Sequence, residues 1–250
     1  MKPNRVPARC TAMILAAGEG TRLRPFTAHT PKPMLPVAGI PVLEHTLNLL
    51  RRHGIPRVVI NLHHRPETVI EHFGGGDPAL QITYSVEPRL LGTAGGVAAM
   101  RSAFGSGSLV VIYGDVLTNM NLTSLLEFHH QHDGVATIAL YRVPNPTECG
   151  LVETNPAGRI LRFVEKPPPK EVFTDWANAG VYVLATDVLP VIPDDTFYDF
   201  GHDLFPALLQ AGEAMYGYPL REHEYLIDIG TVEKYRQAEE EWPGLEAPQA

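Results

Sequence analysis

Residues 13–37 read MILAAGEGTRLRPFTAHTPKPMLPV, and this stretch indicates the fold and a ligand site together. Its apolar start, residues 13–15, predicts a buried β-strand. The small residues that follow let backbone N–H groups approach phosphate oxygens closely. Arg22 and Lys32 add two cations, because an arginine can hold a phosphate with two parallel bonds and a lysine acts as a point charge. We therefore expect a polyphosphate-binding site directly after the first strand.

Two better-known phosphate loops do not match this stretch. A dinucleotide-binding fingerprint needs a third glycine where Leu23 stands, and a P-loop needs a Gly-Lys-Ser/Thr triplet that the sequence lacks. The failed fingerprint, together with the absence of an obvious ribose-binding acid after the second strand, argues against a nicotinamide-dependent dehydrogenase. The absence of a Gly-x-Ser-x-Gly motif disfavours a hydrolase triad.

Strand-like and helix-like segments alternate through the first half of the chain, which predicts an α/β fold with a mostly parallel sheet covered by helices; the second half changes character. Ligands of such sheets bind at the carboxyl ends of the strands, where the glycine loop stands. Expected strands span 57–62, 81–85, 108–113, 135–141, 159–164 and 178–183, and expected helices span 43–52, 66–73, 97–103, 200–210 and 232–241.

Composition limits the class of protein. With 250 residues and 44% apolar content, the chain can bury a large core in one domain. A net charge of −8 disfavours a nucleic-acid surface. Cys10 and Cys149 suggest neither a disulfide framework nor a cysteine-based zinc site, which fits the cytoplasm. Residues 1–10 have no signal-peptide pattern, and 179–192 is too short and interrupted to cross a membrane. The histidines, among them His63, His64, His129, His130 and His132, are interpreted as solvated side chains.

From Leu15 to Pro33 the chain resembles the sugar-1-phosphate nucleotidyltransferases, the nucleoside-diphosphate-sugar pyrophosphorylases. Their loop reads roughly Leu-Ala/Gly-Gly-x-Gly-Thr-Arg-Leu-x-Pro and is followed by Pro-Lys-Pro; this chain departs from it at Ala17, where many members carry glycine. The resemblance extends to the C-terminal helix and is greatest to the short mannose-1-phosphate guanylyltransferase-like members. It implies a Rossmann-like three-layer sandwich with a mixed, mostly parallel central sheet.

The family's organisation implies a single nucleotidyltransferase domain over residues 1–242. Its nucleotide-binding half would span about 11–140 and its sugar-binding half about 141–242. Residues 243–250 are interpreted as a tail. Hexapeptide repeats of the β-helical extensions found in some relatives are absent from this sequence.

The resemblance also implies where the nucleotide binds. Gly92 and Glu87 fall on the positions of the family's base-reading loop. A carboxylate can accept both N1–H and the amino group of guanine, whereas uracil or thymine offers only one donor, so Glu87 favours GTP. The expected nucleotide-binding residues are Leu15, Ala16, Ala17, Gly18, Gly20, Thr21, Glu87, Gly92 and Thr93.

Two aspartates match the family's metal site. Asp115 follows a buried strand in a Gly-Asp pair, and Asp228 precedes Gly230 and Thr231, for which a helix cap is the plain structural reading. Carboxylates and substrate phosphates are the ligands that Mg²⁺ prefers. The resemblance therefore implies Mg²⁺ on Asp115 and Asp228, the only cofactor expected.

The sugar-phosphate site is implied by three further matches. Gly150 belongs to the family's turn and strand beside the sugar, Glu165 and Lys166 to its Phe-x-Glu-Lys-Pro motif, and Asn178 to its Asn-x-Gly strand. Glu165 can accept bonds from sugar hydroxyls, and Lys166 can neutralise the sugar phosphate. Neighbours on a strand point to opposite faces, so both can face the ligand only if the chain bends there.

The implied reaction transfers a nucleotidyl group from a nucleoside triphosphate to a sugar-1-phosphate and releases pyrophosphate, with Arg22, Lys32, Asp115 and Asp228 as catalytic residues. GTP and mannose-1-phosphate are favoured. Uridylyl-, thymidylyl- or cytidylyltransferase and heptose-phosphate guanylyltransferase activities remain open, as does a non-catalytic regulator that binds a nucleotide sugar. The expected partners are these small molecules, with no nucleic acid and no membrane; assembly into a homo-oligomer is left open.

Overall fold

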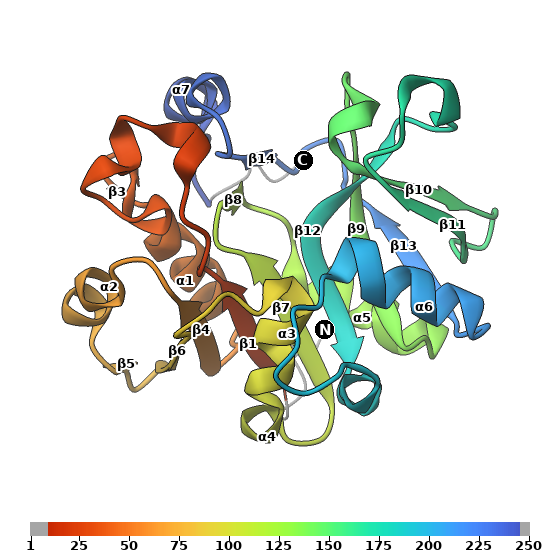
Figure 1. Ribbon diagram of the computed structural model, residues 1–250, viewed down its shortest axis with the longest axis horizontal. Helices are drawn as coiled ribbons and strands as arrows, with labels where there is room; N and C mark the ends of the chain where they lie inside the picture. The colour runs from red at the N-terminus through yellow and green to blue at the C-terminus, as the bar shows by residue number, and fades with distance from the viewer. Residues whose placement is uncertain (1–9, 246–250) are drawn as a thin grey trace, which may run out of the picture. The chain divides into compact units, whose positions relative to one another are not determined.

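The structure is a computed structural model that describes residues 10–245. Residues 1–9, on which most of the signal-peptide prediction depends, and residues 246–250 of the predicted tail lie outside this range. The chain forms two compact units, each made of separate segments (Figure 1). Unit 1 comprises residues 10–90, 112–122 and 221–245, and unit 2 comprises 91–111 and 123–220. The division into halves near residue 140 stays a prediction.

Unit 1 contains a parallel sheet in the order β1-β4-β6, to which the short strand β5 adds in antiparallel orientation. Ile14 pairs with Ile60, and Ile60 with Tyr84. β1 and β4 are nearly continuous buried apolar runs, as strands covered on both faces are. The bounds are Cys10–Leu15 for β1, Arg57–Leu62 for β4, Gly76–Asp77 for β5 and Leu80–Val86 for β6.

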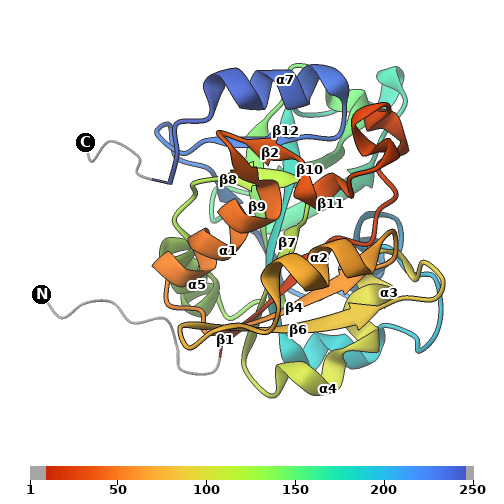
Figure 2. The ribbon, with the colours of Figure 1, turned by 90° about the vertical axis from the view of Figure 1, so that its left-hand side faces the viewer.

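The helices α1, α2 and α7, which are labelled in Figure 2, belong to unit 1. α1 (Val42–Arg52) is amphipathic and buries Leu43, Leu47 and Leu50, as the sequence predicts. α2 (Pro66–Phe73) has the predicted bounds. α7 (Val232–Glu241) begins after Thr231, whose hydroxyl accepts a hydrogen bond from the N–H of Lys234.

Short elements complete unit 1 and form a second apolar core. β8 pairs with β14, and β2 pairs with β3, both in antiparallel orientation. Leu35, Leu117, Ile229 and Tyr235 are among the buried residues that join these strands to α7. The bounds are Pro36–Val37 for β2, Ile40–Pro41 for β3, Val116–Thr118 for β8 and Leu226–Asp228 for β14, with 3-10 turns at Thr21–Leu23, Phe26–Ala28 and Lys32–Met34.

Unit 2 is built on an antiparallel sheet, β11-β10-β12-β9, with β13 added in parallel to β9. β7 (Ser108–Tyr113) carries the chain from unit 2 into unit 1, and α5 (Leu122–His132) carries it back. The strands are β9 (Ala136–Arg142), β10 (Gly150–Thr154), β11 (Ile160–Glu165), β12 (Trp176–Ala185) and β13 (Met215–Pro219). The helices are α3 (Gly92–Ala99), α4 (Arg101–Phe104), a π-helical turn (Phe200–Leu204) and α6 (Phe205–Gln210), with 3-10 turns at Pro146–Glu148, Pro169–Glu171 and Thr186–Val191.

Two local predictions are wrong. The expected loop over 87–96 ends at Leu91, because residues 92–96 are helical and the N–H groups of Ala94 and Gly95 donate to the carbonyl of Tyr198. His129 and His45 are buried rather than solvated: Nδ1 of His129 lies 2.9 Å from the hydroxyl of Thr137, and Nε2 of His45 donates to the carbonyl of Val37 over 2.8 Å. Within residues 10–245, no helix has the length and apolarity that a membrane crossing requires.

Candidate active site

The glycine loop of unit 1 folds back onto the segment that carries Lys32. Gly20 has a φ of 65°, in the left-handed region that favours glycine, and a Cβ there would lie 3.1 Å from the Cβ of Lys32. The hydroxyl of Thr27 donates to the carbonyl of Gly20 over 2.7 Å and fixes this turn. Two motifs of the quoted stretch, the glycine loop and the Pro-Lys-Pro segment, are thus brought together.

Gly114 places Asp115 beside the same loop. Its N–H donates to the carbonyl of Leu15 over 2.8 Å, and a Cβ at Gly114 would lie 2.8 Å from that oxygen and 3.1 Å from the Cα of Ala16. Only glycine permits this approach without displacing backbone. The glycine of the Gly-Asp pair therefore has a packing reason, and the aspartate follows it directly.

Lys32 and Asp115 form an ion pair, although 83 positions separate them in the sequence. Their side chains are 12% and 25% exposed, so the pair is mostly sheltered from water. Burial alone would raise the pKa of Asp115, but the Lys32 ammonium and, more weakly, the Arg22 guanidinium hold that pKa below its usual range. The carboxylate is therefore ionised and able to attract a further cation.

Asp228 is the last residue of β14, and Asp115 directly precedes the partner strand β8. Asp228 pairs with Val116 in the strand register, and the N–H of Ile229 donates to the carbonyl of Asp115 over 2.9 Å. Lys234 of α7 forms an ion pair with Asp228. The sequence analysis did not single out Lys234, and its only signal was a lysine in the first turn after a capping threonine.

Gly230 marks the point where the charged groups of unit 1 converge. A Cβ there would lie 2.8 Å from Oδ1 of Asp228, 3.5 Å from Nη2 of Arg22 and 3.8 Å from Nζ of Lys32. Three of the four predicted catalytic side chains thus surround one glycine, and Asp115 joins them through Lys32. The site combines two carboxylates with a guanidinium and an ammonium, a set suited to bind phosphates and a metal ion.

The predicted base reader Glu87 is buried at 4% exposure in unit 1. Asn61 donates from Nδ2 to its Oε1 over 2.7 Å and accepts from the N–H of Ala16 over 2.8 Å. His63 donates from Nδ1 to the carbonyl of Glu87 over 2.8 Å. Asn61 was missed by the sequence analysis; a polar residue inside the apolar run of β4 was the available signal.

In unit 2, Glu165 lies against two glycines. A Cβ at Gly150 or at Gly201 would come within 2.5 Å of its Oε2. Burial raises the pKa of Glu165, and the nearby Lys166 ammonium opposes that shift without cancelling it. The structure therefore brings together the predicted Gly150 and Glu165 and adds Gly201, which the sequence analysis did not single out.

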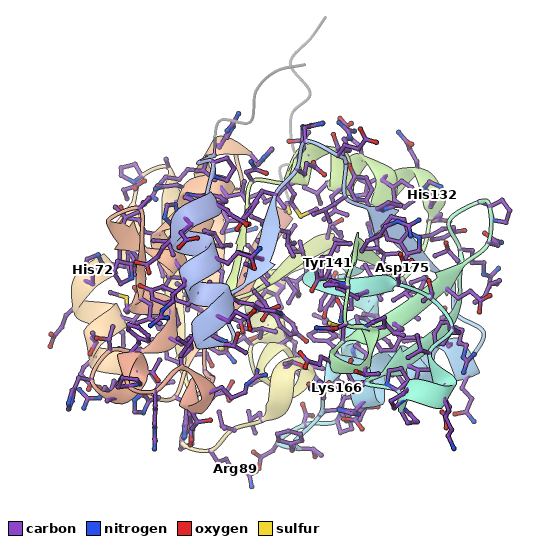
Figure 3. All side chains as sticks on the ribbon, turned by 90° about the horizontal axis from the view of Figure 1, so that it is seen from above. His72, Arg89, His132, Tyr141, Lys166 and Asp175 are labelled. Atoms are coloured by element: carbon purple, nitrogen blue, oxygen red, sulfur yellow. The ribbon has the colours of Figure 1, made fainter. Side chains whose placement is uncertain are left out.

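The bend required at the end of β11 is present. Lys166 has a φ of 45°, in the left-handed region, while its N–H donates to the carbonyl of Cys149 over 3.1 Å. Its side chain, labelled in Figure 3, is 60% exposed, and its Nζ lies 3.8 Å from Oε1 of Glu165. Asn178 accepts from the N–H of Gly180 over 2.9 Å and donates to the hydroxyl of Tyr182 over 2.8 Å, so part of its polar capacity is used within β12.

Two further nucleotide candidates, Gly92 and Thr93, begin α3 in unit 2. Gly92 has a φ of 76°, and a Cβ there would lie 2.6 Å from the carbonyl oxygen of Tyr198. The Thr93 hydroxyl donates to Oδ2 of Asp199 over 2.7 Å and accepts from the N–H of Phe200 over 2.9 Å. Asp199, which the sequence analysis gave no role, therefore ties α3 to the π-helical turn.

Comparison with protein families identifies the chain. A model of the nucleotidyl transferase family matches residues 11–243, nearly all of the sequence. The chain belongs to this family. The resemblance to sugar-1-phosphate nucleotidyltransferases is confirmed at the level of the family.

Two curated relatives show the range of substrates within the nucleotidyl transferase family. The UTP–glucose-1-phosphate uridylyltransferase of Synechocystis sp. is 38% identical over 241 residues, which cover 91% of this chain and 62% of the relative. The mannose-1-phosphate guanylyltransferase of Mycobacterium tuberculosis is 39% identical over 228 residues, which cover 90% of this chain and 62% of the relative. The chain thus spans 62% of the length of each relative.

A solved structure confirms the fold. A putative glucose-1-phosphate thymidylyltransferase from Bacillus anthracis, in complex with a sucrose, superimposes with a TM-score of 0.83 at 24% identity and covers 92% of this chain and 94% of its own. The predicted α/β class with a mixed, mostly parallel central sheet is therefore correct.

Proposed function

We propose that this member of the nucleotidyl transferase family transfers a nucleotidyl group from a nucleoside triphosphate to a sugar-1-phosphate, giving a nucleotide sugar and pyrophosphate. One observation carries the proposal, namely the convergence of Arg22, Lys32 and Asp228 around Gly230. The ion pair of Lys32 with Asp115 adds the second carboxylate. Such a set neutralises charge on reacting phosphates, which is the main task in phosphoryl transfer.

In the proposed reaction, an oxygen of the sugar phosphate attacks the α-phosphorus of the triphosphate. A new bond forms between that oxygen and phosphorus, the bond to the β-phosphate bridging oxygen breaks, and pyrophosphate leaves with that electron pair. A phosphate monoester has a second pKa of about 6, so the nucleophile is already largely anionic near neutral pH. No general base is required, and positioning with charge neutralisation suffices.

The proposed roles follow from charge and placement. Arg22 would hold the triphosphate and the departing pyrophosphate, and Lys32 the reacting phosphates. In unit 2, Lys166 would hold the sugar phosphate, while Glu165 and Asn178 would accept and donate bonds at the sugar. Gly150 leaves space for the side chain of Glu165, because a Cβ at position 150 would lie 2.5 Å from Oε2 of that carboxylate.

Mg²⁺ is the proposed cofactor, held by Asp115 and Asp228. Asp228 ends β14, Asp115 directly precedes its partner strand β8, and both carboxylates already attract lysine ammonium groups, so the donors and the local charge fit a divalent cation. Within residues 10–245, no group of three or more His, Cys, Asp or Glu side chains is arranged for a metal. The remaining ligands would be phosphate oxygens and water, and the bound ion would supply charge neutralisation.

GTP and mannose-1-phosphate are the proposed substrates. The guanylyltransferase relative of M. tuberculosis supports this pair, whereas the Synechocystis relative, named a uridylyltransferase, supports the uridylyl alternative to a similar degree. Glu87 favours guanine, because a carboxylate can accept from both N1–H and the amino group of that base, and the amide of Asn61 holds this carboxylate over 2.7 Å. The cytoplasm is the proposed location, since two cysteines in 250 residues suggest no disulfide framework.

Pyrophosphate release tests the proposal directly. The full chain is assayed with Mg²⁺, crossing GTP, UTP, dTTP, CTP and ATP against mannose-, glucose- and N-acetylhexosamine-1-phosphates. We expect the highest rate with GTP and mannose-1-phosphate. If the rate were highest with another pair of substrates, the proposed reaction would stand, but the assigned base or sugar would be wrong. If no substrate pair released pyrophosphate but the protein still bound a nucleotide sugar, the enzyme assignment would be overturned in favour of a regulator.

A further inference from the structure

Lys234 stands at a position where its charge is locally unfavourable. It is the third residue of α7, and its N–H donates to the capping hydroxyl of Thr231 over 3.3 Å. A capping box places Glu or Gln at this position, and the positive end of the helix dipole disfavours a cation in the first turn. A lysine there goes against local helix preferences, which is expected where function compensates.

The compensating contact is the ion pair of Lys234 with Asp228. Asp228 is the carboxylate whose Oδ1 also accepts from the N–H of Gly230 over 3.2 Å and lies within the cluster of Arg22 and Lys32. The Lys234 ammonium therefore binds the same carboxylate that the proposed function assigns to a metal ion.

We infer that Lys234 is an internal counter-ion of Asp228, which a divalent cation must displace in order to bind. This inference rests on the metal site of the proposed function and adds a residue that sets its affinity. Without metal, Lys32 pairs with Asp115 and Lys234 pairs with Asp228, so each carboxylate already has a counter-ion.

The two ion pairs differ in how easily they can open. The Lys32 side chain is 12% exposed, whereas Lys234 and Asp228 are 34% and 32% exposed. A lysine on an exposed helix turn can move its ammonium into water at small cost, because such ion pairs are weak. Lys234 is therefore the lysine that leaves its carboxylate when a metal ion binds. The free energy needed to break its ion pair with Asp228 lowers the affinity for the metal ion.

Mn²⁺ binding to the full chain without nucleotide tests this inference independently of catalysis. Free Mn²⁺ is measured by electron paramagnetic resonance from micromolar to millimolar concentrations. Lys234→Met removes the competing cation while keeping a long, unbranched side chain, and we expect its affinity for Mn²⁺ to rise about two- to fivefold, the scale of one partly exposed ion pair. Lys234→Arg keeps the charge and should bind Mn²⁺ as the wild type does.

A matched control and a double variant separate local from general effects. Lys170→Met changes the net charge by the same amount at an exposed position in unit 2 and should leave the affinity unchanged. Asp228→Asn should weaken Mn²⁺ binding, and in that background Lys234→Met should give no gain. Thermal unfolding of each variant verifies that the fold is retained.

The outcomes distinguish the inference from the function on which it rests. If wild type and Lys234→Met bound Mn²⁺ with equal affinity, or if neither bound it, the inference would be overturned. An equal gain from Lys234→Arg or Lys170→Met would overturn it as well, because the effect would not be the loss of this one charge. If Asp228→Asn bound Mn²⁺ as wild type does, the proposed metal site itself would be wrong.

Discussion

The side chain of Asn61 donates from Nδ2 to Oε1 of Glu87 over 2.7 Å, and both residues are almost fully buried. The same amide accepts from the N–H of Ala16 over 2.8 Å. One side chain at the end of β4 therefore fixes both the start of the glycine loop and the proposed base reader. Neither can shift without leaving a buried polar group unpaired.

Replacing Asn61 by alanine should impair both stability and nucleotide binding. The change deprives Glu87 and the Ala16 N–H of a buried partner, so we expect a loss of about 1–3 kcal/mol in the free energy of unfolding. The KM for the nucleoside triphosphate should rise, while the KM for the sugar phosphate stays near that of wild type. Urea unfolding and steady-state kinetics measure both, with Asn48→Ala on α1 as control. Wild-type stability together with wild-type nucleotide KM would contradict the positioning role.

Gly230→Ala should damage catalysis without unfolding the protein. The added methyl would lie 2.8 Å from Oδ1 of Asp228, a movable side-chain atom, so the carboxylate shifts and the backbone does not. A displacement of about 1 Å at a reacting centre can cost about 10²-fold in rate, and we expect a loss of that order. Turnover and melting temperature are measured beside Gly75→Ala, whose methyl meets nothing within 4 Å. Equal turnover in the two variants would argue against the convergence at Gly230.

Gly201→Ala should act on the sugar phosphate alone. Its methyl would come within 2.5 Å of Oε2 and 3.0 Å of Cδ of Glu165, and would push that carboxyl from its place. We expect a raised KM for the sugar-1-phosphate and an unchanged KM for the nucleotide, which serves as the internal control. A rise in the nucleotide KM alone would contradict the assignment of Glu165 to the sugar.

Glu165→Gln should make the protein more stable at neutral pH. Because burial raises the pKa of Glu165 above 4.5, the folded state binds its proton more tightly than the unfolded state does. Tighter proton binding at Glu165 in the folded state contributes to the free energy of unfolding. That contribution is fully present below the unfolded-state pKa of Glu165 and is lost as pH rises through its folded-state pKa. Wild type should therefore lose stability relative to the variant over that window, while the variant binds the sugar phosphate poorly.

Urea unfolding from acidic to neutral pH measures this difference. Glu171→Gln, at an exposed position shortly after Glu165, serves as a control for removing one negative charge. The prediction would be wrong if the difference in free energy of unfolding between wild type and Glu165→Gln did not change with pH. It would also be wrong if wild type were the more stable protein at neutral pH, because burial of the ionised carboxyl would then not be costly.

The spacing of apolar residues and the positions of turn residues were sufficient to predict most helices and strands of the fold. The strands at 57–62 and 108–113 and the helices at 66–73 and 232–241 have the predicted bounds, because apolar runs and capping residues act locally. The start of α3 could not be predicted in this way. It depends on the carbonyl of Tyr198, which accepts from two N–H groups of that helix.

The sequence pointed to the motif residues of the candidate site and not to their partners. Arg22, Lys32 and Asp228 belong to recognisable motifs, and the structure brings them together around Gly230, while their roles stay predictions. Lys234 and Asn61 have no motif, and their roles depend on strand register and on contacts that no local pattern specifies. Each of the two units is assembled from segments that the sequence separates, and no local pattern specifies such an assembly.

Turnover of Asp115→Asn, measured as pyrophosphate release at saturating Mg²⁺ with the most active substrate pair, tests the proposed catalytic centre most directly. The amide keeps the shape of the carboxyl but removes the charge that pairs with Lys32 and that would hold the metal ion. The account predicts a loss of about 10²–10³ in turnover, by analogy with the removal of one oxyanion-stabilising group. The exposed Asp187→Asn control should keep wild-type turnover. Near-wild-type turnover of Asp115→Asn would contradict the account.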